Sequence, residues 1–168
     1  MAAPDVPRFS SLLGAGSCWI GDGARDKWAA IELGLDRLVQ SGRVPAARRD
    51  ACHAAIVERE KSMSTGMENG IAIPHAAVDG LDELATGLAV FRQGVPFQSI
   101  DGKPARIVVL ILIPKERRLA YLRVLADAAR LLAREDVRER LLAAKSSQDV
   151  FEAIAAAESG QTPTSAAP

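Results

Sequence analysis

Apolar residues recur at helical spacing in the first third of the chain. In the stretch 24–40 they fall on one face at steps of three and four residues, at positions Trp28, Ile31, Leu35 and Leu38. Ser41 and Gly42 follow, and residues of this kind commonly end a helix. Pro45 suits the first turn of the next helix, where a backbone N–H has no partner to lose. The pattern predicts helices at 24–40 and 45–59.

The last third of the chain shows the same periodicity. An amphipathic helix is predicted at 119–132, with apolar residues at Leu119, Leu122, Leu125, Ala126, Ala129 and Leu132. A shorter helix is predicted at 136–144. Ser146 and Asp149 have the spacing of a capping box, with Asp in place of the usual Glu, and predict a last helix that ends at 157.

Short apolar runs outside these helices predict strands at 18–20, 71–73, 87–91 and 105–113. Residues 95–97 predict a short extended piece. The run 105–113 is almost continuously apolar and ends at Pro114, as is typical of a strand that is buried on both faces. Asp101 and Gly102 precede it and predict a turn of the kind that joins neighbouring antiparallel strands. We therefore predict an α/β fold with a mixed central sheet that is flanked by helices on both faces.

The chain is predicted to form one domain between two irregular ends. Residues 1–8 contain prolines and no periodicity, so we expect a flexible N-terminal arm. Residues 158–168 are mostly small or polar and predict a disordered tail. The single domain spans 9–157 and opens with one helical turn at 9–13. A chain of 168 residues is long enough to bury a core of its own.

Composition and charge narrow the classes of function. Hydrophobic residues make up 48% and charged residues 25% of the chain, which is globular composition. The 21 basic residues balance the 21 acidic ones, and aromatic residues are only 4%. Bulk positive charge and stacking platforms are therefore both missing, and we expect no nucleic acid as partner.

The sequence gives no sign of a membrane segment, a metal site or a cofactor site. The longest apolar run spans 107–113, far short of the roughly 20 residues of a membrane helix, and no signal peptide opens the chain. We therefore expect a soluble cytoplasmic protein with no direct membrane insertion. Cys18 and Cys52 lack metal-ligand spacing and are interpreted as free thiols. Glycine-rich nucleotide loops are absent, so no cofactor is predicted.

The stretch 64–77 carries the candidate chemistry. Gly66 and Gly70 permit tight turns, and a short apolar strand then stops at Pro74. The next residue is His75, which this arrangement would hold rigidly at a sheet edge or in a crevice. A histidine titrates near neutral pH, so it suggests chemistry, although an ordinary residue at a strand end is the alternative. The other histidine, His53, lies among charged residues in a helix and is assigned no role.

These residues resemble a known family. Arg59-Glu60, Ser64-Thr65-Gly66 and Gly70-Ile-Ala-Ile-Pro-His75-Ala are similar to the signature of type-2 enzyme IIA domains of the bacterial sugar phosphotransferase system. That group comprises the fructose/mannitol class and a nitrogen-related regulatory branch. The segment 95–104, the strand that ends at Pro114 and the helices after it also fit. The resemblance covers roughly 9–157.

The resemblance implies a phosphocarrier. His75 would accept a phosphoryl group from a histidine phosphocarrier protein (HPr-like). It would pass the group to a cysteine of a IIB domain or, in the regulatory branch, signal its state to a transporter or kinase. An imidazole with one unprotonated nitrogen is a suitable nucleophile. Arg59 would neutralise the phosphoryl oxygens, because a guanidinium holds two of them at once. A cation at a helix C-terminus is the plain alternative for Arg59.

Each of the other residues that match the family signature has two possible roles. The hydroxyls of Ser64 and Thr65 and the backbone N–H of Gly66 would bind phosphate, or would only shape the loop. Glu60 would order this loop or pair with Arg59. In the family a second histidine lies near the first. Tyr121 stands at its position here, and a neutral phenol puts the rate of transfer and the phosphohistidine lifetime in doubt. Arg123 is a candidate for a replacement charge.

Three alternatives to a regulatory phosphocarrier remain. The chain carries no IIB or IIC segment, which favours the nitrogen-related branch over the IIA component of a fructose/mannitol-type sugar importer. A non-catalytic IIA-like binding module that regulates by contact would keep the fold without transfer. A hydrolase with His75 as general base would need a Ser or Cys nucleophile within hydrogen-bond reach.

Overall fold

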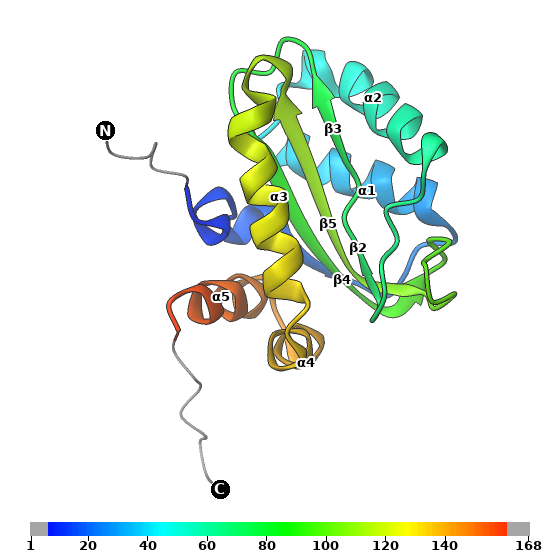
Figure 1. The fold of residues 1–168 in the computed structure, drawn as a ribbon, viewed down its shortest axis with the longest axis vertical. Helices are drawn as coiled ribbons and strands as arrows, with labels where there is room; N and C mark the ends of the chain where they lie inside the picture. The colour runs from blue at the N-terminus through cyan, green and yellow to red at the C-terminus, as the bar shows by residue number, and fades with distance from the viewer. Residues whose placement is uncertain (1–6, 161–168) are drawn as a thin grey trace, which may run out of the picture.

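A mixed five-stranded sheet forms the centre of the molecule (Figure 1). The computed structural model describes residues 7–160. The strands are β1 (Cys18–Gly21), β2 (Ile71–Ala72), β3 (His75–Val78), β4 (Ala85–Val95) and β5 (Ala105–Pro114). The order is β1-β4-β5-β2, and β3 also pairs with β5. Only β4 and β5 run antiparallel to each other, while the other pairs are parallel.

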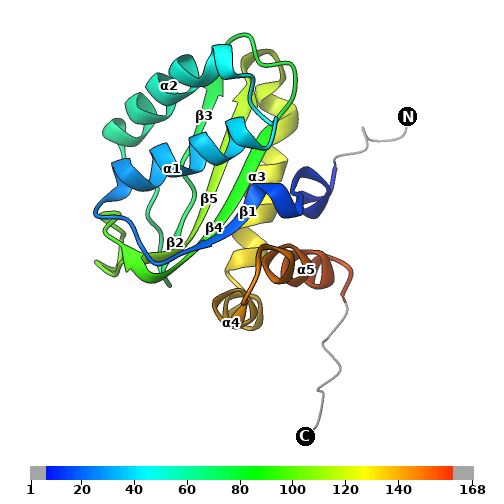
Figure 2. The same ribbon diagram turned by 180° about the vertical axis from the view of Figure 1, so that it is seen from behind.

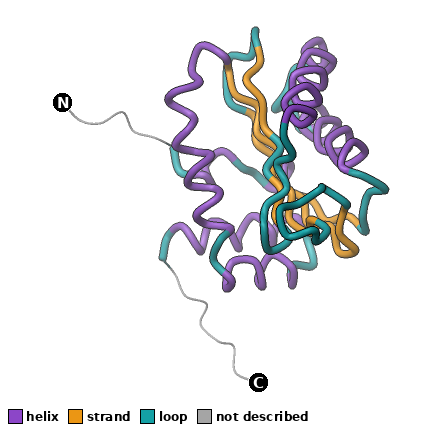
Figure 3. Tube along the Cα trace, turned by 45° about the vertical axis from the view of Figure 1, so that its right-hand side comes forward, coloured by secondary structure: helices purple, strands orange, loops and turns teal. Residues whose placement is uncertain are grey.

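Helices cover both faces of this sheet, which confirms the predicted α/β architecture (Figures 2 and 3). One face carries α1 (Lys27–Gln40) and α2 (Arg49–Ser62). The other face carries α3 (Arg118–Leu132), α4 (Glu135–Ala143) and α5 (Ser147–Glu158). Short 3-10 turns lie at Phe9–Leu12, Ala15–Ser17, Ala46–Arg48 and Lys115–Arg117. No described helix is long and apolar enough to cross a bilayer.

The central strand β5 explains the continuous apolar run in the sequence. Its side chains alternate between the two faces, as successive residues of a strand do. Val109 and Ile111 join the core beneath α3, α4 and α5. Leu110 and Leu112 join the core beneath α1 and α2. Because both faces are covered by helices, both sets of side chains are buried, as predicted.

Helix boundaries differ from the prediction where local capping decides them. Helix α1 begins at Lys27 rather than at 24, because the carboxylate of Asp26 accepts a hydrogen bond from the N–H of Ala29 at 2.9 Å. Helix α2 follows a 3-10 turn after Pro45 and extends to Ser62 rather than 59. The capping box before α5 is confirmed, because Ser146 and Asp149 each bond the other's backbone N–H.

Strand β3 was missed by the sequence analysis. The apolar run 71–73 was expected to end at Pro74 and leave His75 beyond it, whereas His75 opens the new strand. Pro74 has no N–H to donate, but its carbonyl accepts a hydrogen bond from the N–H of Ile111 at 3.0 Å. The chain therefore stays paired with β5 through the proline. Strand β4 also extends beyond the predicted 87–91 to include Val95.

Helix α3 confirms the amphipathic helix predicted at 119–132, but the apolar side chains of its first turn and a half face outward. Leu119 is 85% exposed and Leu122 is 48% exposed. Of the predicted apolar positions Leu132 is buried in the core, together with Val124, Ala128 and Leu131. This helix has apolar residues on more than one face, and its packing on the sheet selects which face is buried.

The two predicted irregular ends lie mainly outside the described residues. Of the arm at 1–8, only Pro7 and Arg8 are described, and of the tail at 158–168, only the first residues through 160. Helix α5 includes Glu158, so the tail does not begin there. A carboxylate oxygen of Glu158 accepts a hydrogen bond from the N–H of Ser10 at 2.8 Å, which joins the two ends of the described chain.

Candidate functional site

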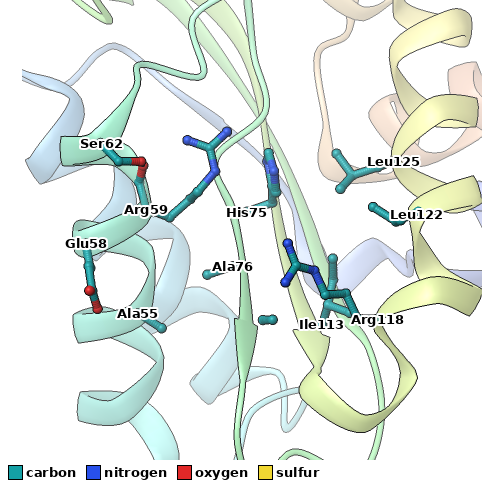
Figure 4. Close-up of a pocket in the computed structure, with 11 residues that line it drawn as sticks. Ala55, Glu58, Arg59, Ser62, His75, Ala76, Ile113, Arg118, Leu122 and Leu125 are labelled. Carbon is teal, nitrogen blue, oxygen red and sulfur yellow. The ribbon is translucent and has the colours of Figure 1, made fainter.

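His75 lies at the edge of the sheet in a cavity of about 390 Å³ between α2 and α3 (Figure 4). As the first residue of β3 it pairs in register with Ile111 of β5. The α2 wall includes Ala55, Arg59 and Ser62, and the α3 wall includes Arg118, Leu122 and Leu125. A second, smaller cavity of about 200 Å³ continues past His75 toward Ser64, Thr65 and Gly66. The predicted crevice is therefore present.

The imidazole of His75 is fixed in one tautomer. Its Nδ1 lies 2.7 Å from the carbonyl oxygen of Ile73. A carbonyl can only accept, so Nδ1 carries the hydrogen and donates it. The ring nitrogen Nε2 then keeps its lone pair, and no described residue forms a hydrogen bond with it.

The neutral form of His75 is favoured by its surroundings. Burial is the largest cause that lowers its pKa, and the nearby cations Arg59 and Arg118 lower it further. The hydrogen bond to Ile73 and the charge of Glu60 act in the opposite direction. The net shift is downward from the ordinary value of 6.5, so the imidazole is mainly neutral at pH 7 and available as a nucleophile.

Arg59 and Arg118 flank His75 from the two sides of the cavity (Figure 4). Arg59 sits in the last turn of α2, and its Nη1 donates to the carbonyl of Met63 at 2.9 Å. Arg118 is the first residue of α3. Within residues 7–160 neither guanidinium has a carboxylate at ion-pair distance. Both therefore remain able to bind an anion beside the imidazole.

Arg118 was not identified from the sequence. Arg123 was suggested as the replacement charge, but it does not line the cavity around His75. The segment after β5 contains Lys115, Arg117 and Arg118 in close succession. This basic cluster could have been recognised in the sequence. Which of its three cations points toward β3 depends on the residue at which α3 begins.

The loop residues Ser64, Thr65 and Gly66 bond within the protein. The hydroxyl of Ser64 donates to the carbonyl of Phe97 and accepts from the N–H of Gly66. Thr65 gives both its N–H and its hydroxyl to the carboxylate of Glu60, the latter at 2.6 Å. Of the two roles that the sequence left open, these contacts favour shaping the loop.

Glu60 orders that loop through a buried ion pair with Lys27. The Lys27 Nζ lies 3.2 Å from Glu60 Oε1 and donates to the side-chain oxygen of Gln98 at 2.8 Å. Both charged side chains are buried. Glu60 therefore pairs with Lys27 and not with Arg59. The role of Lys27 was missed because its partners lie 33 and 71 residues away in sequence.

Gly66 is required by close packing. A Cβ at this position would lie 2.7 Å from the Ser99 hydroxyl and 2.8 Å from the Ser99 Cα, well inside van der Waals contact. Four residues on, Gly70 has a φ of 73°, and its carbonyl accepts from the N–H groups of Arg106 and Ile107. The loop is thereby fixed at both ends against the 97–107 segment.

Tyr121 does not line either cavity beside His75. Its ring packs against the core cluster beneath α3. A hydrogen bond to the Tyr121 phenol is the largest cause that raises the pKa of Arg117. Tyr121, which the resemblance places where a second histidine is expected, is therefore packed on the core and lies outside both cavities beside His75.

The described serines and cysteines are not arranged as a hydrolase nucleophile for His75. The hydroxyl of Ser62 donates to the carbonyl of Arg59 at 2.7 Å, and the hydroxyl of Ser64 donates to the carbonyl of Phe97. Cys18 and Cys52 are buried free thiols, and burial raises the pKa of Cys18 to about 12. In the described part of the chain no Ser or Cys forms a hydrogen bond with His75, which disposes of that alternative.

Exposed apolar side chains surround the mouth of the site. Met63, Ile100 and Leu122 are 70%, 78% and 48% exposed, and we call these three residues the apolar rim. Leu122 lines the larger cavity and Ile100 the smaller one, each together with His75. The carbonyl of Met63 holds Arg59. Large exposed side chains that gather around one site are typical of a surface that meets another protein.

Comparisons with known proteins identify the family to which this fold belongs. The family model for the EIIA 2 component of the phosphoenolpyruvate-dependent sugar phosphotransferase system matches residues 12–157. A fructose-specific EIIA component from Haloferax volcanii is 40% identical over 129 residues, which cover 77% of this chain and 82% of that protein.

Solved structures share the fold. The nitrogen regulatory protein IIA-Ntr from Neisseria meningitidis superposes with a TM-score of 0.76 at 25% identity, covering 86% of this chain and 97% of that chain. Enzyme IIAMTL from Escherichia coli, solved with phosphorylated enzyme IIBMTL, gives a TM-score of 0.69 at 27% identity, covering 85% and 96%. With its fold and its matched residues 12–157, the chain belongs to the EIIA 2 family of the sugar phosphotransferase system.

Proposed function

We propose that this protein is a phosphohistidine carrier with His75 as the phosphoryl acceptor. The observation that carries the proposal is the fixed tautomer of His75, in which Nδ1–H donates to Ile73 and Nε2 keeps its lone pair. The cavity places Arg59 and Arg118 on either side of this imidazole. A neutral nucleophile between two guanidinium groups that have no carboxylate at ion-pair distance is suited to receive a phosphoryl group.

The transfer step follows from this arrangement. The Nε2 lone pair of His75 attacks phosphorus, and the bond between phosphorus and the donor nitrogen breaks, with its electrons returning to the donor ring. The donor ring carries a proton on its other nitrogen and therefore leaves as a neutral imidazole, while the positive charge passes to the phosphorylated ring of His75. The Nδ1 proton stays on the His75 ring, held by Ile73. Arg59 and Arg118 bind the phosphoryl oxygens, whose charge must be neutralised throughout an in-line transfer. Ser64, Thr65 and Gly66 keep the loop in place beside them.

The donor in this proposal is a histidine phosphocarrier protein of the HPr type. Such a donor must bring its own phosphohistidine against His75, so it must cover the mouth of the cavity. The apolar rim offers contacts for this docking at positions that surround His75. A IIB domain is the proposed acceptor, since enzyme IIAMTL is known in a complex with phosphorylated enzyme IIBMTL.

A regulator that acts by contact alone is the second candidate. It is favoured by the fact that His75 is the one imidazole among the residues that line the two described cavities, with Tyr121 turned to the core. The comparisons include fructose-type and nitrogen-regulatory proteins. The expectation of the nitrogen-related branch therefore remains a prediction.

Intact-mass analysis tests the carrier function directly. The purified protein is incubated with phosphoenolpyruvate, enzyme I and a histidine phosphocarrier protein. We expect an acid-labile gain of one phosphoryl group that is lost in His75→Ala. His53→Ala is the matched control, because His53 lies beside Glu32 at 3.8 Å, away from the cavity, and should be phosphorylated like the wild type.

No mass gain, with donors that phosphorylate another IIA domain, would overturn the carrier and leave the contact-only regulator. The Tyr121→His protein would then show whether a second imidazole restores uptake. Chase of the phosphorylated protein with a IIB domain separates the branches. Transfer to a IIB cysteine indicates a sugar importer component, and retention of the phosphoryl group supports the regulatory branch.

A further inference from the structure

Another cavity, lined by basic and apolar residues, lies at the other end of β5 from the His75 site. Its volume is about 370 Å³, and it opens between the segment before β5 and helix α4. Lys103, Arg106 and Arg138 supply positive charge, while Pro104, Ile107 and Leu142 supply apolar surface. None of these residues lines the cavities around His75. We call this the basic cavity.

The three cations of the basic cavity form no ion pair with a carboxylate of the described residues. Across residues 7–160 no carboxylate lies within ion-pair distance of Lys103, Arg106 or Arg138. The nearby Asp101 accepts hydrogen bonds at both carboxylate oxygens, from the backbone N–H groups of Asn69 and Lys103. The charge of Lys103 helps to lower the pKa of Asp101, so this lysine is partly compensated. Arg106 and Arg138 line the cavity without a carboxylate at ion-pair distance, so an anion placed there would be stabilised.

Both arginines are held in position by backbone carbonyls. Arg106 donates its Nε to the carbonyl of Arg92 at 3.2 Å. Arg138 donates its Nη1 to the carbonyls of Leu132 and Ala133 at 3.0 and 2.6 Å. Each guanidinium keeps further N–H groups that form no hydrogen bond with a described residue. Because the side chains are already anchored, a ligand would not need to order them, which lowers the cost of binding.

The basic cavity is separate from the His75 site along the sheet. Ile71 pairs with Ile107 beside the basic cavity, whereas His75 pairs with Ile111. Four residues of strand correspond to about 13 Å. The volume falls near the lower end of the range of small-molecule sites, roughly 300–1,000 Å³. The space is therefore suited to a small organic ligand rather than to a protein segment.

We infer that the basic cavity binds a small organic oxyanion, a carboxylate or a phosphate ester, that carries an apolar group. Guanidinium groups bind either oxyanion through paired N–H donors, and Lys103 adds a point charge. The apolar part of the ligand would pack on Pro104, Ile107 and Leu142. This inference does not depend on phosphoryl transfer at His75.

Titration of the full chain with benzoate and with phenyl phosphate tests the site. Backbone amide shifts are followed by nuclear magnetic resonance at constant ionic strength. We expect saturable shifts at Gly70, Lys103 and Arg106 with one or both probes. Saturation with only one of them identifies the oxyanion as a carboxylate or as a phosphate ester. Phenol at equal concentration should give no saturable shift, because it lacks the charge.

Charge removal provides the decisive comparison. Lys103→Gln and Arg106→Gln should each raise the Kd for the bound probe roughly tenfold, as expected for the loss of a charge-assisted contact. Lys145→Gln and Arg140→Gln remove the same charge elsewhere and should leave Kd unchanged, since neither residue lines the basic cavity. The inference is overturned if the shifts stay linear, if they are confined to the surroundings of His75, or if the control variants weaken binding equally. Lys103 is exposed, so its variant should fold normally.

Discussion

The two sides of the His75 cavity are built on different principles. On the α2 side, a buried network of Lys27, Glu60 and Thr65 fixes the loop that borders the site. On the α3 side, Arg118 and Leu122 lie exposed at the start of a helix. The guanidinium of Arg118 forms no hydrogen bond with a described residue. One side is held by internal contacts, and the other is left available for external ones.

This difference indicates a division of roles. A phosphoryl acceptor requires fixed surroundings, because small displacements of positioning groups slow transfer strongly. A protein that binds several partners requires an accessible surface whose exposure to solvent costs little stability. The α2 side meets the first requirement at the expense of burying two charges, and the α3 side meets the second. Variants on the two sides should therefore separate stability from transfer.

The largest effect is expected from Glu60→Gln. The substitution leaves the Lys27 ammonium buried without its counter-charge, and breaking a buried pair in this way typically lowers the free energy of unfolding by about 3–5 kcal/mol. Urea denaturation measures the loss. Glu58→Gln, an exposed position on the same helix, should change stability by less than about 0.5 kcal/mol. Equal effects of the two variants would show that the network does not hold the α2 side.

The double variant Lys27→Met/Glu60→Gln sharpens this test. Removal of both charges eliminates the unpaired ammonium, so the double variant should be more stable than Glu60→Gln alone. The carboxylate that accepts from Thr65 is still missing, and phosphoryl uptake should remain slow. The double variant would then regain stability without regaining the rate of phosphoryl transfer.

A smaller effect, confined to transfer, is expected from Arg118→Gln. Loss of one charge-assisted contact to the phosphoryl group should slow uptake roughly tenfold or more. Because the cation lowers the pKa of His75, its removal should raise that pKa and increase the protonated fraction below neutral pH. The acid limb of the pH–rate profile should therefore move to higher pH. Imidazole resonances titrated by nuclear magnetic resonance check the direction of the shift.

Arg123→Gln is the matched control for Arg118, because it removes the same charge from the same helix outside the cavity. It should change neither the rate nor the pKa of His75. A normal uptake rate in Arg118→Gln would remove Arg118 from the mechanism. Both variants should unfold at the wild-type urea concentration, since exposed positions without ion pairs contribute little to stability.

Local patterns in the sequence were sufficient to predict much of the fold. The apolar run 105–113 predicted the buried strand β5, and Ser146 with Asp149 predicted the cap of α5. Strand β3 was not predicted, because His75-Ala-Ala-Val is short and rich in alanine. Its alternation of half-buried and buried residues therefore shows little contrast in hydrophobicity. Its pairing through Pro74 depends on a carbonyl, which no side-chain pattern reveals.

The candidate site was predictable only in part, for a related reason. His75 and Arg59 lie in or near one contiguous motif, and both line the same cavity. Lys27 and Arg118 come from distant segments, and only the folded arrangement of α1, α2 and α3 brings them to the site. The exposure of Leu119 and Leu122 could not be predicted, because periodicity identifies an apolar face without telling whether protein or solvent lies against it.

Leu122→Gln should have the smallest effect on stability and still separate the two sides. Leu122 is 48% exposed on the apolar rim, and glutamine keeps helix propensity, so the free energy of unfolding should change by less than about 0.5 kcal/mol. The KM for the histidine phosphocarrier should rise, because docking loses an apolar contact beside His75. Leu33→Gln is the matched control, since Leu33 is 41% exposed on α1, on the opposite face of the sheet from α3. A KM that is unchanged in Leu122→Gln, or raised equally in Leu33→Gln, would mean that the partner does not dock on the α3 side.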